Sequence, residues 1–234
     1  GGAIYSTGSL TISNSSFSGN VAGQFGSAIY TGGNYTVTNS TINGTVYNAG
    51  KPLVSSLSPT AGPLAGGTSL SLTGTGFDGT TKVSFGATDT TQFTVADNEH
   101  MTVTTPAHIA GVVNVTVTSA AGTSLTSAND QFTYQPVPAV SGLTPAKGPT
   151  AGGTTVTVTG TDFTNVSAVT IGGTSASFSV SSATQMTVTT PARAAGVADL
   201  RVTTAGGTSA VVAADRFTYV APPSVSGLAP TAGP

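Results

Sequence analysis

Apolar and polar residues alternate along most of the chain after residue 52. In segments such as 69–73, 101–104 and 155–159, Leu, Val or Met at every second position is separated by Ser or Thr. A period of two places alternate side chains on opposite faces of a strand, so the apolar set is expected to face a core. Gly or Pro ends most segments, and no stretch shows sustained helical spacing of apolar residues. The pattern predicts an all-β protein built from short strands.

These alternating segments recur with a long period. A phrase of the form Leu-x-Pro-x-x-Gly-Pro starts at Leu57, Leu143 and Leu228, and the second interval is one position shorter than the first. The segments after Leu57 recur in the same order after Leu143, with one residue fewer between Gly172 and Phe178 than between Gly86 and Phe93. A phrase that recurs at this interval marks the start of a domain.

We therefore predict two complete domains, at residues 52–135 and 138–220, and the start of a truncated third at 222–234. About seven short strands per unit are typical of a two-sheet immunoglobulin-type sandwich. The residues expected in the first core alternate along its strands: Leu70, Leu72, Val83, Phe85, Phe93, Val95, Met101, Val103, Val115 and Val117. Neither a Cys pair nor a Trp is present to pin the sheets, so aliphatic and Phe side chains must hold them.

The glycines and prolines of the opening phrase have separate roles. Pro59 and Pro63 cannot donate to a ladder, so they are expected to end or bend an edge strand. Gly66-Gly67 and Gly152-Gly153 permit positive φ or close backbone approach at the turn into the next strand.

Residues 1–48 follow a different repeat. Residues 1–5 match 26–30, and residues 10–12 match 35–37, at an offset of 25. One such unit cannot bury its apolar side alone, but stacked copies can, as in a parallel β-helix. We predict the last two coils of a longer, incomplete helix, weakly held and with an unpaired strand edge at Gly1.

Four tyrosines of this segment have two interpretations. They are Tyr5, Tyr30, Tyr35 and Tyr47. They either line one flank as an aromatic platform for sugars or pack as a stacked ladder, and packing is favoured.

Two resemblances follow from the motifs. Gly-Gly-Ala-Ile with Phe17-Ser-Gly-Asn20 resembles the repeat of polymorphic outer-membrane proteins and related right-handed β-helical surface passengers of bacteria. The opening phrase resembles that of the IPT/TIG domain, as do the Gly-x-x-Phe, Val-x-Phe-Gly, Thr-Thr-Pro and closing Phe-Thr-Tyr motifs that follow it. That family has an immunoglobulin-like (E-set) fold and occurs in plexins, transcription factors and bacterial surface proteins. The resemblances imply tandem immunoglobulin-like sandwiches after the C-terminal end of a right-handed parallel β-helix.

The low content of charged residues restricts the classes of partner that the chain can be expected to bind. Charged residues make up 6% of the chain, the net charge is −2, and six basic residues are scattered singly. This low and dispersed charge argues against binding to nucleic acid and against electrostatic attachment to a membrane. Some IPT/TIG proteins bind DNA, but that role is not expected here because the loops lack Arg and Lys. No apolar run reaches the ~18 residues of a membrane span, so no membrane insertion is expected within this segment. Without Cys there is no disulfide or thiolate metal site.

Asp97-Asn-Glu-His100 is the only acidic cluster. As a metal or acid–base site it would offer three oxygen or nitrogen groups within four residues. As a turn between two strands it needs only Asx chemistry, and the second unit has Ser and Thr there, so a turn is favoured. Whether this turn binds an ion stays open.

The other candidates for chemistry are isolated. His108 has Arg193 as its counterpart, and a Ser-His-Asp triad would need a His beside a buried Asp. Asp130 and Asp215 both stand two residues before the closing Phe, which favours a turn or backbone cap. We predict no catalytic, cofactor-binding or metal-binding residue, no cofactor, and no enzymatic activity.

The favoured function is a non-catalytic structural or adhesive segment of a large, secreted bacterial surface protein. Its immunoglobulin-like repeats would form a stalk or presentation module outside the cell. Its partners would be neighbouring domains of the same chain and a host or cell-surface protein or glycan. The alternative is a carbohydrate- or protein-binding accessory module of an extracellular polysaccharide-acting system. A β-helical lyase or hydrolase is disfavoured because residues 1–48 contain no Asp, Glu, His, Lys or Arg.

Overall fold

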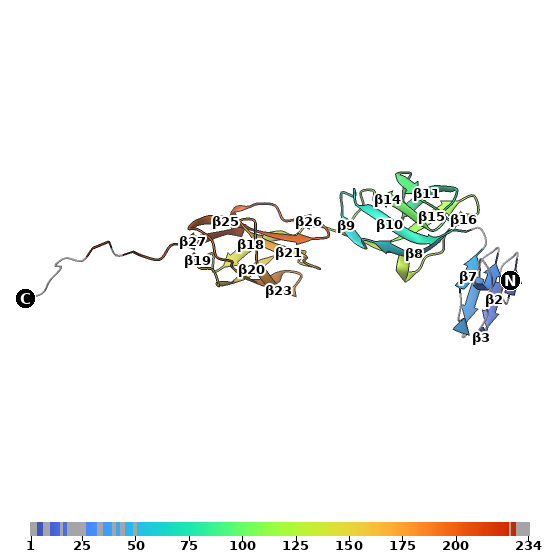
Figure 1. Ribbon diagram of the computed structural model, residues 1–234, viewed down its shortest axis with the longest axis horizontal. Coiled ribbons are helices and arrows are strands. Elements are labelled where there is room, and N and C mark those ends of the chain that lie inside the picture. Colours follow the sequence, from blue (N-terminus) through green and yellow to red (C-terminus); the bar gives the residue numbers. More distant parts are fainter. Residues whose placement is uncertain are drawn as a thin grey trace, which may run out of the picture. The chain divides into compact units, whose positions relative to one another are not determined.

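The computed structural model describes residues 51–224, 226 and 227, and seven short segments before them. Those segments are 4–6, 10–14, 16–17, 27–31, 35–38, 41–42 and 45–48. The described elements are strands, apart from two 3-10 turns, η1 (Ala128–Asp130) and η2 (Ala213–Asp215) (Figure 1). The all-β prediction is confirmed. The strand edge predicted at Gly1, the packing of the four tyrosine side chains and most of the predicted third domain lie outside what the structure describes.

Before residue 51 the described strands pair in parallel. Their order is β1 (Ile4–Ser6), β4 (Ser27–Thr31) and β7 (Thr45–Asn48) in one sheet, β2 (Leu10–Ser13) with β5 (Tyr35–Thr38), and β3 (Ser16–Phe17) with β6 (Thr41–Ile42). Ile4 pairs with Ile29 and Leu10 with Tyr35, which reproduces the repeat seen in the sequence. β7 adds a third strand that this repeat does not predict, because Tyr47 follows its partner Tyr30 at a shorter interval.

The first domain contains strands β8 to β17. Their bounds are β8 (Leu53–Ser58), β9 (Ala61–Pro63), β10 (Ser69–Thr75), β11 (Thr80–Phe85), β12 (Thr88–Thr90), β13 (Phe93–Val95), β14 (His100–Thr104), β15 (Gly111–Ser119), β16 (Gly122–Thr123) and β17 (Gln131–Gln135). One sheet has the order β13-β14-β10-β8, and the other has the order β12-β11-β15-β17-β9, with β16 paired to β15.

The second domain repeats this arrangement with strands β18 to β27. Their bounds are β18 (Ala139–Thr144), β19 (Lys147–Pro149), β20 (Thr155–Thr161), β21 (Ala168–Ile171), β22 (Thr174–Ser175), β23 (Ser177–Ser182), β24 (Gln185–Thr189), β25 (Gly196–Thr204), β26 (Gly207–Thr208) and β27 (Arg216–Val220). The sheet orders are β18-β20-β24-β23 and β19-β27-β25-β21-β22, with β26 on β25. The domains are immunoglobulin-like sandwiches, and short pieces such as β16 and β22 bring the strands above the seven expected.

The opening phrase is the place where the first strand of each domain changes sheet. β18 pairs antiparallel with β20 in the four-stranded sheet. After Pro145 the chain continues as β19, which pairs in parallel with β27 in the other sheet. β8 and β9 are divided between the two sheets of the first domain in the same way, on either side of Pro59. Pro suits this position because it cannot donate to a continuing ladder.

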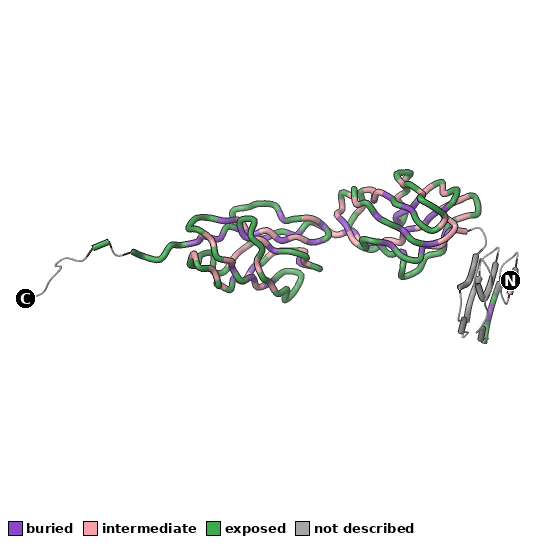
Figure 2. The backbone as a smooth tube through the Cα atoms, viewed as in Figure 1, coloured by how far each residue is buried: buried purple, intermediate pink, exposed green. Residues whose placement is uncertain are grey.

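The core of the first domain holds most of the residues that the alternation predicts (Figure 2). Those exposed by at most 2% are Leu70, Leu72, Val83, Phe85, Met101, Val103, Val115 and Val117. Phe93 and Val95, predicted with them, are only half-buried because β13 is the edge strand of its sheet. The Phe85 and Phe132 rings meet edge to face with centroids 5.9 Å apart.

The Gly-Gly-Thr and Thr-Thr-Pro motifs bind each other. Gly67 N donates to Thr105 O (2.8 Å), and Thr105 N donates to Thr68 O (2.9 Å). The buried Thr105 Oγ1 accepts from Thr68 N at 3.0 Å. Gly66 has φ +72°, and a Cβ there would lie 2.5 Å from the Pro106 carbonyl group, so the predicted need for glycine is confirmed. Gly152, Gly153, Thr154 and Thr190 repeat this arrangement in the second domain.

Candidate functional site

The acidic cluster forms an Asx turn between β13 and β14. Asp97 Oδ1 accepts from the backbone N–H groups of Glu99 and His100, both at 2.8 Å. The His100 ring nitrogen Nδ1 lies 2.9 Å from the same oxygen. The Glu99 N–H, followed by the His100 ring, lowers the pKa of Asp97 from its ordinary value. The Asp97 carboxylate and the His100 ring, two of the groups that a metal site would use, therefore already contact each other.

This turn also supports the neighbouring loop. Its carbonyl groups at Asn98 and Glu99 accept from Phe77 N (3.1 Å) and Gly74 N (2.8 Å). In the second domain the carbonyls of Ala183 and Thr184 accept in the same way from Phe163 N (2.9 Å) and Gly160 N (3.0 Å). The turn therefore holds the Gly-x-x-Phe loop in both domains, whether or not it carries charge.

Lowering the pH is expected to destabilise the first domain, in part because Asp97 becomes protonated. A carboxyl group whose pKa is lowered on folding stabilises the fold above its ordinary pKa, and this contribution is lost as pH falls through the folded value. Asp97→Asn should therefore flatten the fall in Tm of the first domain between neutral pH and the acid range, measured by differential scanning calorimetry. Glu99→Gln is the control, because the Glu99 side chain makes no hydrogen bond among the described residues. Identical pH profiles for wild type and Asp97→Asn would contradict this role.

Asp130 and Asp215 cap the turns that lead into the closing strands. Both side chains are fully buried. Asp130 Oδ2 accepts from Ser127 N, and Asp215 Oδ2 accepts from Val212 N at 2.8 Å. Burial raises the pKa of Asp130, and the Ser127 N–H opposes that change. These contacts agree with the backbone cap expected from the recurrence of the two residues.

His108 and Arg193 occupy equivalent positions with different contacts. His108 Nδ1 lies 2.9 Å from Ile109 O. Arg193 Nη1 donates to Gly172 O at 2.7 Å and so secures the turn between β21 and β22. Among the described residues, no three His, Asp or Glu side chains gather closely enough to hold a metal ion.

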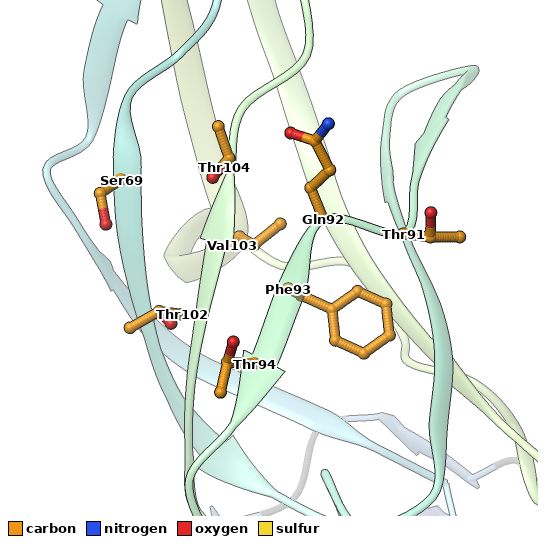
Figure 3. A pocket seen from close by; sticks show the side chains of 8 residues that line it. All are labelled: Ser69, Thr91, Gln92, Phe93, Thr94, Thr102, Val103 and Thr104. Atoms are coloured by element: carbon orange, nitrogen blue, oxygen red, sulfur yellow. The ribbon is translucent and has the colours of Figure 1, made fainter.

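A hydroxyl-lined groove lies over β10, β14 and β13 of the first domain (Figure 3). Its volume is about 250 Å³. The lining residues are all uncharged: Ser69, Thr91, Gln92, Phe93, Thr94, Thr102, Val103 and Thr104. Ser69 pairs with Thr104 and Thr94 with Thr102 across the strands, so these four side chains share the outer face of the sheet.

The first domain has one residue more between Gly86 and Phe93 than the second has between Gly172 and Phe178, and this longer segment lies beside the groove. β12 has three residues, and Val83 pairs with Thr90, whereas β22 has two. The chain then reaches Gln92, whose carbonyl accepts from Thr104 N at 2.9 Å. The second domain has Ser177 in this place, paired with Thr189. The sequence shows that the second domain is one residue shorter here, but nothing in the sequence alone connects this difference with a site.

A charged pair fixes β12. Asp89 Oδ2 accepts from Lys82 Nζ at 2.8 Å, and Asp89 Oδ1 accepts from Ser84 Oγ at 2.6 Å. Lys82 and then Ser84 lower the pKa of Asp89. These contacts tie the strand before the groove to β11, while the groove itself has a neutral lining.

Comparison with known proteins identifies both domains. The IPT/TIG domain family matches residues 52–134 and again residues 138–219. The chain belongs to the IPT/TIG family. No curated protein matches it. Among the described residues of this IPT/TIG protein, no helix has the length and apolar character to cross a membrane.

Several solved structures are similar to this chain. The plexin A4 extracellular region is 20% identical, with 72% of this chain and 18% of that chain covered and a TM-score of 0.44. SGBP-B from a complex xyloglucan utilization locus in Bacteroides uniformis is 26% identical, with 68% and 47% covered and a TM-score of 0.32. SGBP-B of a Bacteroides ovatus mixed-linkage glucan utilization locus, in complex with a mixed-linkage heptasaccharide, is 19% identical, with 78% and 48% covered and a TM-score of 0.33. The matched region therefore spans less than half of each of these chains.

Proposed function

We propose that this chain is a non-catalytic segment of a long, secreted bacterial surface protein, in which the IPT/TIG domains form a stalk that presents other domains. The observation that carries the proposal is the reuse of polar residues for structure in both domains. Asp130 and Asp215 cap equivalent turns, and Thr105 and Thr190 close equivalent clamps. A repeated unit whose buried polar groups secure its own fold suits a spacer.

The N-terminal strands extend the proposal. Parallel pairs such as Ile4 with Ile29 and Leu10 with Tyr35, in register at one constant sequence offset, are the pattern that stacked coils produce. We infer that residues 1–48 are the C-terminal coils of a right-handed parallel β-helix, and that residues 222–234 begin another IPT/TIG domain. The stalk would then join a β-helical shaft to further repeats at the bacterial cell surface.

The link before the second domain supports a short joint. Pro138 is buried. A Cβ placed on Gly207 would lie 3.4 Å from the Val137 side chain, so Val137 lies next to this glycine. A Cβ on Gly206 would overlap the carbonyl oxygen of Pro136, so glycine is needed for the link to lie against the turn between β25 and β26. Residues 136–138 are therefore held by the domain that follows them.

Spin labels provide the test, because the chain has no Cys of its own. Cysteines introduced at the exposed residues Thr81 and Ser175 place one label on each domain. The stalk proposal predicts a narrow distance distribution by double electron–electron resonance, and Gly206→Val should broaden it. Lengthening the link with a Gly-Ser segment gives the reference for a flexible joint. A wild-type distribution as broad as that reference would refute the stalk.

Absence of catalysis is a separate part of the proposal. Its support is that Asp97 and His100 are engaged in a turn that the second domain builds without them. Turnover of a polysaccharide by this chain, abolished by Asp97→Asn or His100→Ala in a folded protein, would overturn it. The alternative function, a carbohydrate- or protein-binding accessory module, is favoured by one feature, the groove of the first domain.

A further inference from the structure

We propose that the groove over β13, β14 and β10 binds a neutral saccharide, and that this site belongs to the first IPT/TIG domain. The proposal goes beyond the stalk, since a spacer needs no ligand. It rests on the groove's free hydrogen-bonding groups, on its neutral lining, and on the residue that distinguishes it from the second domain.

The polar side chains of the groove have no partners among the described residues. The hydroxyls of Ser69, Thr94, Thr102 and Thr104 and the amide of Gln92 make no hydrogen bond within that part of the chain, and they lie together on one face (Figure 3). A hydroxyl donates once and accepts twice, and a primary amide does both. The groove therefore offers mixed donors and acceptors over a small area, which is the complement of a sugar that carries several hydroxyls.

The lining selects against other ligand classes. Phosphate or carboxylate groups are bound most strongly by Arg or Lys, and neither lines the groove. An apolar ligand would cover the hydroxyls without satisfying them, which costs free energy for each group left unpaired. The methyl groups of Thr94, Thr102 and Thr104 provide a small apolar surface beside these hydroxyls.

The size of the groove fits a single sugar unit of a longer chain. Its volume of about 250 Å³ is below the roughly 300 Å³ at which enclosed small-molecule pockets begin. At ~30 Å³ for each water in the liquid, it holds about eight waters. One pyranose ring with its hydroxyls displaces a similar volume of water.

The second domain provides an internal contrast. It keeps hydroxyls at the matching positions, Thr155, Ser179, Thr187 and Thr189, but has Ser177 in place of Gln92. Thr187 Oγ1 already donates to Ser179 O at 3.5 Å, whereas Thr102 in the first domain has no such bond among the described residues. We therefore assign the binding preference to Gln92 and Thr102.

The test is an NMR titration of the whole chain with neutral hexasaccharides of glucose, xylose, mannose and galactose, and with a hexamer of galacturonic acid. The proposal predicts that at least one neutral hexasaccharide shifts the side-chain amide of Gln92 and the backbone amides of Thr94 and Thr102. The amides of Ser177, Ser179 and Thr187 should stay in place.

Matched variants locate the site. Gln92→Ser installs the residue of the second domain, and Thr102→Val removes a hydroxyl while keeping the side chain's shape. Each should weaken binding about three- to tenfold. Thr187→Val, the same change in the second domain, should have no effect. A thermal melt of each variant, with a cooperative transition like that of the wild type, serves as the control for folding.

Four results would overturn the proposal. They are no shifts with any neutral sugar, equal shifts in both domains, binding of the galacturonic acid hexamer alone, and unchanged affinity in folded Gln92→Ser and Thr102→Val. None of these results bears on the stalk, whose test is the distance between the two domains.

Discussion

Replacing Gly160 with alanine is expected to destabilise the second domain by about 3 kcal/mol, lowering its Tm by roughly 12–24 °C. The Phe163 ring lies over Gly160, and a Cβ there would overlap both the Ala139 carbonyl oxygen and the ring. The backbone of Ala139 belongs to a paired strand and the ring is 1% exposed, so neither can move freely. Overpacking of this kind forces shifts in both the core and the sheet.

Calorimetry of the whole chain measures this effect against a close control. Gly142→Ala places a methyl group on the neighbouring strand of the same sheet, where the only atom of the described residues within 4 Å is the Thr159 hydroxyl oxygen at 3.1 Å. That side chain can rotate away, so the Tm of the second domain should change little. Equal losses in the two variants would mean that the Gly160–Phe163 contact has no special role.

Removing the Phe132 ring should cost the first domain about 3–5 kcal/mol, because the ring is fully buried and truncation leaves a cavity. Phe132 meets Phe85 edge to face in the centre of the core, with an angle of 88° between the rings. The expected result for Phe132→Ala is a large fall in the Tm of the first domain in calorimetry, while the second domain melts as before.

Phe93→Ala is the matched control for this prediction. Phe93 lies on the edge strand β13 and is half-buried, so its loss should cost less than about 2 kcal/mol. If Phe93→Ala proved as damaging as Phe132→Ala, the core would extend to the edge of the sheet. The alternation of apolar and polar residues predicts that Phe93 and Phe132 are both core residues, but in the structure only Phe132 is fully buried.

The sequence predicts the fold of the two domains closely because its signals are local and occur twice. The alternation identifies strands such as β10 and β20, and the glycines of the opening phrase identify the turns before them. The clamp between Gly67 and Thr105 could not be derived, since it joins motifs far apart in the chain that only the folded sheet brings together. The recurrence of both motifs was the available signal.

Other features of the structure depend on where a strand lies within its sheet, and the alternation of apolar and polar residues carries no information about that position. Phe93 alternates like a core residue but lies at an edge, and the change of sheet after Pro59 has no signature beyond the proline itself. β7 could not be predicted from the 25-residue repeat, because it repeats Ile-Tyr as Val46-Tyr47 at a shorter interval. The groove also could not be predicted, because its hydroxyls resemble every other outward Ser and Thr until Gln92 and the extra residue are placed beside them.

The β10–β14 ladder of the first domain and the β20–β24 ladder of the second are nearly identical, which can lead to incorrect pairing between domains during folding. Leu70 pairs with Val103 and Leu72 with Met101, just as Val156 pairs with Val188 and Val158 with Met186. Each of these strands thus has a second acceptable partner one domain away, and tandem repeats with such partners are prone to interdomain misassembly.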